Sequence, residues 1–72
     1  MFMTLLEQLA MKLYDVYVME EQRQGDIGHT FLYAQLSKDA QRTYLVLALF
    51  ILRHVNDDEI IQLMINDPLE GP

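Results

Sequence analysis

The sequence predicts an all-α fold: a small bundle of three to four helices in a single domain spanning residues 1–72, with two copies of the chain forming a dimer. Three observations lead to this prediction. Apolar residues recur at helical spacing through most of the chain, residues that cap helices precede those segments, and glycine and proline gather mainly at 25–28 and 68–72. The helices are expected at 5–24, 29–36, 38–55 and 57–66, followed by a flexible tail at 67–72.

The first helix is expected to begin after Thr4, because Thr4 and Glu7 have the spacing of a capping box, in which each side chain bonds the other residue's backbone N–H. Gly25 is expected to end it, since glycine readily takes the left-handed conformation found just after a helix. Two apolar stripes run along this helix. The main stripe consists of Leu6, Leu9, Leu13, Val16 and Tyr17, and a flanking stripe consists of Met11, Tyr14 and Val18.

The segment 38–55 contains nine consecutive apolar residues, at 44–52, between Arg42 and Arg53. Roughly 20 such residues are needed to cross the hydrocarbon core of a membrane, so a membrane span is excluded. A buried strand would also give a short apolar run. However, Ser37 is a good N-cap, and Asp39 suits the positive end of a helix dipole. We therefore expect a helix here.

Two shorter helices complete the expected bundle. The segment 29–36 is short, and its pattern alone does not classify it securely. Asn56 is expected to cap the last helix, with Glu59 at the capping-box position and with Val55 and Ile60 forming a hydrophobic staple around the cap. Proline at position 68 is expected to end it.

The helix at 38–55 is apolar nearly all round, so it must be covered from several sides. Val46 and Phe50 form the face that the remaining helices have most difficulty covering. A chain of 8.5 kDa hides only about 60% of the surface that its unfolded form exposes. A second chain is the simplest cover, and it predicts self-association or an obligate partner. The alternative is a tightly packed monomer that hides the whole helix.

The net charge of −6 argues against nucleic acid and anionic membranes as partners. Five acidic residues lie in the last quarter of the chain with no lysine or arginine among them: Asp57, Asp58, Glu59, Asp67 and Glu70. An acidic helix at 57–66 is also a poor match for the recognition helix of a helix-turn-helix motif. We expect no direct DNA binding and no membrane binding.

The sequence contains no pattern typical of an enzyme. The two histidines, His29 and His54, are far apart and lack the spacing of a zinc site, and the chain has no cysteine. Its one serine, Ser37, is explained by capping. We therefore expect no catalytic residue, no metal and no cofactor.

The sequence favours the role of a small protein–protein interaction module, a cytoplasmic regulator or inhibitor that binds another protein and forms a homodimer. The size and character would suit a regulator encoded by a phage. Methionine and aromatic side chains are frequent at interfaces, and they supply most of the candidate partner-binding residues. These candidates are Met11, Tyr14, Tyr17, Val18, Val46 and Phe50. The alternatives are a dimeric helical transcriptional regulator that touches nucleic acid and an acidic decoy of a DNA-binding site.

Overall fold

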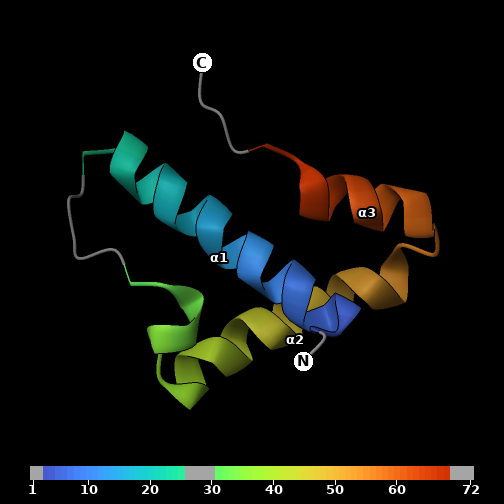
Figure 1. Ribbon diagram of the computed structural model, residues 1–72, viewed down its shortest axis with the longest axis horizontal. Helices are drawn as coiled ribbons and strands as arrows, with labels where there is room; N and C mark the ends of the chain where they lie inside the picture. Colours follow the sequence, from blue (N-terminus) through green and yellow to red (C-terminus); the bar gives the residue numbers. More distant parts are fainter. Residues whose placement is uncertain (1–2, 26–30, 69–72) are drawn as a thin grey trace.

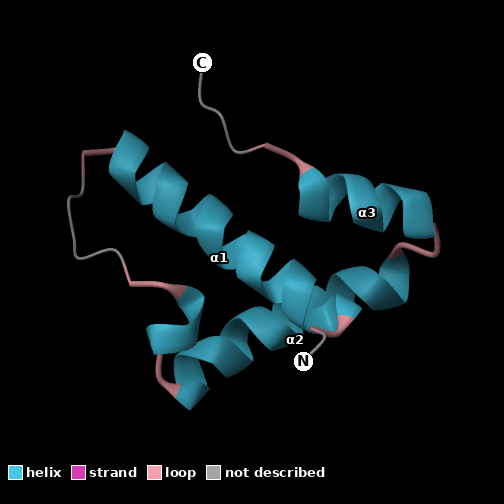
Figure 2. Ribbon diagram, in the orientation of Figure 1, coloured by secondary structure: helices cyan, strands magenta, loops and turns pink. Residues whose placement is uncertain are grey.

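The computed structural model describes residues 3–25 and 31–68, which form three α-helices and one short 3-10 turn (Figures 1 and 2). In chain order these are α1 (Leu5–Arg23), η1 (Tyr33–Gln35), α2 (Lys38–His54) and α3 (Asp58–Asn66). Within these described ranges there is no strand, so the prediction of an all-helical fold is confirmed.

The central element is α1, which contacts α2, α3 and η1. In Figure 1, α2 and α3 flank the N-terminal half of α1. The helix at 38–55 was expected to need cover from several sides. In the structure α2 packs mainly on α1 and leaves much of its circumference exposed, so the alternative of a monomer that hides the whole helix is wrong.

The capping box that begins α1 is present as predicted. The Thr4 hydroxyl accepts a hydrogen bond from the Glu7 backbone N–H at 3.1 Å, and Glu7 Oε1 accepts one from the Thr4 backbone N–H at 3.3 Å. Gln24 caps the other end, and Gly25 follows with φ of 81°. A side chain would be strained in that conformation, which explains why glycine ends this helix.

The expected helix at 29–36 is wrong for the part that the structure describes. Residues 29 and 30 lie outside the described ranges, and only Tyr33–Gln35 form a single 3-10 turn. Leu36 is extended, and Ser37 then begins α2 by accepting a hydrogen bond from the Ala40 N–H at 3.2 Å. The short apolar segment is therefore limited to this single 3-10 turn before the N-cap at Ser37.

The start of α3 also differs from the prediction, because Asp57 and not Asn56 is the N-cap. Asp57 Oδ1 accepts a hydrogen bond from the Glu59 N–H at 3.0 Å. Moving the cap by one residue changes the partners of a hydrophobic staple, so the expected pair of Val55 and Ile60 does not hold. Ile60 is 46% exposed, whereas its neighbour Ile61 is 1% exposed and anchors the helix.

The residues after α3 were expected to form a flexible tail from 67 onward. Asp67 instead caps α3, and its carbonyl oxygen accepts a hydrogen bond from Lys12 Nζ of α1. This bond ties the end of α3 to the middle of α1. Residues 69–72 lie outside the described ranges.

The core is small. It is centred on Leu9 and Ala10 of α1 and Ala48 of α2, all fully buried. Two alanines facing each other allow the helix axes to approach closely, which explains why this pair of elements makes the main contact. On α1 the buried face is rotated from the predicted one, because Val16 and Tyr17 are exposed while Tyr14 is buried.

Candidate functional site

All four tyrosines of the chain lie close together where α1, η1 and α2 meet. The rings of Tyr14 and Tyr44 contact edge to face with centroids 5.3 Å apart, and Tyr33 lies 6.2 Å from Tyr14 and 6.4 Å from Tyr44. Tyr17 lies 6.4 Å from Tyr44 on the outer side of the cluster. Such tilted pairs favour the interaction of a ring edge with a ring face, so the cluster stabilises the junction beyond its buried area alone.

The position of Tyr14 corrects the sequence analysis, which counted this residue among the candidates for binding a partner. The side chain is 7% exposed, and its hydroxyl donates a hydrogen bond of 2.5 Å to the Phe31 carbonyl oxygen. The reason is the tyrosine cluster: the ring fills the space between α1 and α2, and its polar tip holds the segment before η1. Tyr14 is therefore a structural residue in this fold.

Burial raises the pKa of the Tyr33 and Tyr44 hydroxyls above the usual value of 10.0. Removal from water disfavours the phenolate, and nearby Glu7 adds a smaller effect for Tyr33. The Tyr33 hydroxyl donates to the Gln41 carbonyl at 3.3 Å, and the Gln41 side chain donates to the Tyr33 carbonyl at 3.0 Å. These two reciprocal hydrogen bonds hold η1 on the first turns of α2. The raised pKa of Tyr33 is therefore a consequence of how the ring is packed.

The most strongly shifted pKa belongs to an exposed ion pair near the end of α1. The guanidinium of Arg23 donates two hydrogen bonds to the Glu20 carboxylate, of 2.9 Å and 2.7 Å, and thereby lowers the pKa of Glu20 to about 2. Gln24 adds a third bond to the same carboxylate at 3.2 Å. These groups lie on a solvent-exposed helix end. The lowered pKa of Glu20 therefore reflects its ion pair with Arg23, three residues along the same helix, and does not indicate catalysis.

The other candidate residues differ in exposure. Met11 and Val18 are half-buried, whereas Tyr17, Val46 and Phe50 are 51%, 55% and 62% exposed. Val18 helps to line a hollow of about 240 Å³ between the second half of α1 and the chain before η1. Tyr14 and Val18 thus line this hollow, whereas Val46 and Phe50 form an α2 group on another surface.

The α2 group belongs to a continuous exposed surface, here called the α2 face. Its members, all exposed, are Asp39, Arg42, Thr43, Val46, Leu49, Phe50 and Arg53. At about 100° per residue, Val46 lies on the opposite side of the helix from the buried Ala48, so this face points away from α1. Sequence reasoning identified only Val46 and Phe50. The spacing of 39, 42, 46, 49 and 53, alternating three and four residues, was a signal for the rest.

One end of the α2 face is organised by His54. The imidazole stacks on the Phe50 ring, with centroids 4.2 Å apart and planes inclined by 28°. Its Nδ1 lies 2.8 Å from the Phe50 carbonyl oxygen. The Phe50 ring is thus supported on one side by its own helix, which reduces the conformational freedom that it loses on contact with another surface.

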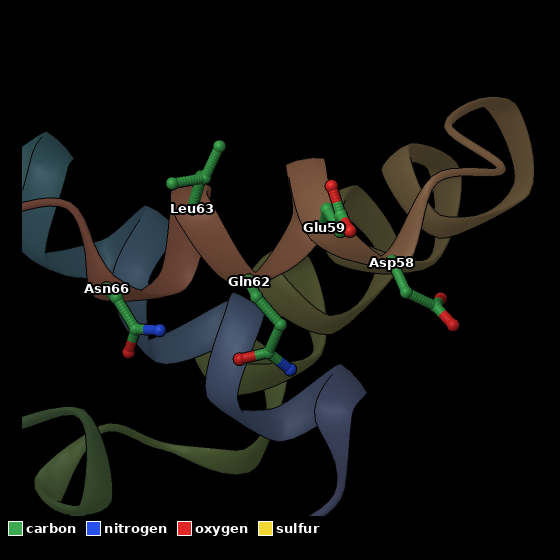
Figure 3. A pocket seen from close by; sticks show the side chains of 5 residues that line it. All are labelled: Asp58, Glu59, Gln62, Leu63 and Asn66. Atoms are coloured by element: carbon green, nitrogen blue, oxygen red, sulfur yellow. The ribbon is translucent and has the colours of Figure 1, made fainter.

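A shallow hollow of about 440 Å³ lies along α3 (Figure 3). Leu63 projects from one side of the helix, and Gln62 and Asn66 project from the other. Asp58 and Glu59 of the first turn complete the described lining. The hollow is open, with carboxylates and amides along one helix. It offers no enclosed space in which a reacting group would be shielded from water.

Residues 3–25 and 31–68 contain no buried polar or charged side chain and no group of three or more side chains able to hold a metal ion. None of the helices in these ranges is long and apolar enough to cross a membrane. The surface feature that stands out is the number of large apolar side chains in contact with water. Those that are more than a third exposed are Met3, Val16, Tyr17, Phe31, Leu32, Val46, Leu47, Leu49, Phe50, Ile60 and Leu63.

Comparison with known proteins finds no matching family model, no similar curated protein and no similar solved structure. The function of the chain is therefore inferred from its own residues and their arrangement.

Proposed function

We propose that this protein is a non-enzymatic protein–protein interaction module that works as a homodimer and regulates or inhibits another protein. The observation that carries the proposal is the α2 face, where Val46, Leu49 and Phe50 lie side by side and exposed. Neighbouring exposed apolar side chains on a small protein are typical of interaction surfaces, because exposing them to water is unfavourable.

The total surface supports the same proposal. The chain exposes 5926 Å². A folded monomer of this mass exposes ~4,700 Å², so about 1,200 Å² of additional surface faces water. An interface of standard size covers ~800 Å² on each partner. An area of that order is enough for a stable contact, and the α2 face contributes three exposed apolar side chains to the surface: Val46, Leu49 and Phe50.

Two further observations support a binding role over an enzymatic one. The hollows on α3 and beside Val18 are open, and the large lowering of the pKa of Glu20 arises from an exposed pair with Arg23. Active sites typically combine an enclosed pocket with titratable groups perturbed by burial. Dimerisation through α2 would leave Leu32 and Leu63, on other parts of the surface, available to a regulated protein.

The experiment that tests this proposal compares two matched substitutions by sedimentation equilibrium. Val46→Glu introduces a carboxylate on the α2 face and is expected to convert a dimer into a helical monomer near 8.5 kDa. Leu63→Glu, at an apolar residue of α3 that is 71% exposed, is the control and is expected to leave the dimer intact. A wild-type protein that is monomeric at micromolar concentration would contradict the proposed homodimer.

A further inference from the structure

We infer that the occupant of the α2 face is the α2 face of a second copy, packed antiparallel, with Val46 at the two-fold axis and with Asp39 of each subunit paired with the partner's Arg53. This inference rests on the proposed function and specifies its partner and geometry. It follows from the order of charged and apolar residues along one exposed stripe.

The stripe has the spacing that two helices need to pack along their length. Positions 39, 42, 46, 49 and 53 alternate three and four residues apart, the repeat that keeps one seam facing a partner helix. All five side chains are exposed, and the buried Ala48 lies on the opposite side of the helix. The stripe extends along nearly the whole of α2, so a second helix can contact it without displacing α1.

The charges select the antiparallel direction. Asp39 and Arg53 are each seven residues from Val46, about 10.5 Å along the axis in opposite directions. If the partner helix runs antiparallel with Val46 facing Val46, each Asp39 lies opposite the partner's Arg53, so two ion pairs form at the rims. A parallel pair would instead place Asp39 opposite the same residue of the partner, and likewise Arg53, and like charges would repel.

The same register also places favourable neighbours opposite each other between the centre and the rims. Arg42 lies opposite the partner's Phe50, whose ring is exposed and supported by His54. An arginine over an aromatic face is a favourable cation–π contact. Thr43 lies opposite the partner's Leu49, next to the apolar centre.

Sliding the partner by one helical turn removes these matches. In one direction, Asp39 comes opposite a position beyond the end of the partner's α2, which ends at His54, so it loses its pairing with Arg53. In the other direction, Arg42 comes opposite the partner's Val46, where its charge would be covered without an acidic partner. Both alternatives are less favourable, because each loses the pairing of Asp39 with the partner's Arg53, and a covered charge without a partner is costly.

The first test uses charge reversal, with the association of each chain measured by sedimentation velocity. Asp39→Arg alone and Arg53→Asp alone each place like charges at both rims and are expected to weaken self-association by at least ~10-fold. An equimolar mixture of these two variants restores both attractive pairs, since one chain then carries two arginines and the other two aspartates. The mixture is expected to form a heterodimer with an affinity close to that of the wild-type homodimer.

The second test does not depend on how charge reversal affects the fold. The chain has no cysteine, so Val46→Cys introduces a single thiol, which lies at the two-fold axis. Under mild oxidation this variant is expected to form a disulfide-linked dimer, because facing residues near the axis lie within the ~7 Å that a disulfide permits between Cα atoms. Phe50→Cys is the control: its two copies would be about 12 Å apart along the axes, so it should not cross-link.

The outcomes separate the inference from the proposed function. A monomeric wild-type protein would overturn both. A dimeric wild type would leave the proposed homodimer standing, but would overturn the inferred register if the mixed charge variants fail to associate and Phe50→Cys cross-links in place of Val46→Cys. Restored association in the mixture together with cross-linking at position 46 would support the antiparallel pairing.

Discussion

The hydroxyl of Tyr14 connects the middle of α1 to the chain before η1 through its bond to the Phe31 carbonyl oxygen. Tyr14→Phe keeps the ring in the cluster and removes only this bond, so it is expected to lower the free energy of unfolding by about 1 kcal/mol. Tyr33→Phe removes a longer bond, of 3.3 Å, and is expected to cost less. Urea unfolding of both variants checks this order, and an unchanged midpoint for Tyr14→Phe would contradict it.

The raised pKa values of Tyr33 and Tyr44 predict how stability depends on alkaline pH. The folded state keeps these phenols protonated at pH values where the unfolded chain releases their protons. Their contribution is therefore fully present below pH 10.0, the ordinary pKa, and is lost as pH rises through the higher folded pKa. Urea midpoints measured from about pH 8 upward are expected to fall beyond about pH 10.

The double variant Tyr33→Phe with Tyr44→Phe is the control for this pH dependence. It has no phenol at either position, so its alkaline decline is expected to be shallower than that of the wild type. An equally steep decline in the double variant would show that other groups are responsible.

At the scale of elements, the boundary between α2 and α3 provides a direct comparison of neighbouring residues. Asp57→Ala removes the side chain that accepts from the Glu59 N–H and is expected to lower the free energy of unfolding by about 1 kcal/mol. Asn56→Ala, one residue earlier, is expected to change it by less than half as much. Thermal melts of the two variants measure the difference. A larger loss of stability for Asn56→Ala would show that Asn56, as the sequence analysis expected, caps the helix.

Local signals predicted α1, α2 and α3 to within about two residues of their observed ends, because capping depends on residues close together in sequence. Thr4 with Glu7, Ser37 and Gly25 all act at the helix ends where the sequence placed them. The error at the start of α3 arose because Asn56 and Asp57 are both good caps, and only the packing of Ile61 against the rest of the fold decides between them.

Which face of each helix is buried was harder to predict, because it depends on contacts between distant segments. Tyr14 and Tyr17 are both aromatic and three residues apart, yet the first is buried and the second exposed. The difference comes from Tyr33 and the chain before η1, which cover only one side of α1. Val46 and Phe50 were recognised from the sequence as apolar residues that are difficult to cover. The charged members of the α2 face share their spacing, but the spacing alone does not show that this side of the helix is exposed.

For the whole molecule, a small core and a proposed dimer together predict a stability that depends on protein concentration. Association favours the folded state by mass action, so the melting temperature of the wild type is expected to rise as its concentration increases. Val46→Glu, which is expected to stay monomeric, should melt at the same temperature at every concentration. Differential scanning calorimetry over a range of concentrations makes the comparison, and a constant melting temperature for the wild type would contradict the prediction.

The tyrosine cluster has a consequence for observing this protein in solution. The chain contains no tryptophan, and its four tyrosine rings form contacts with centroids 5.3–6.4 Å apart. Rings this close exchange excitation energy, and their asymmetric surroundings give a near-ultraviolet circular dichroism signal. Both properties weaken when α1, η1 and α2 separate, because Tyr33 and Tyr44 then leave the rings of α1. The protein thus carries an intrinsic optical reporter of its tertiary structure, which needs no label and leaves the α2 face unmodified.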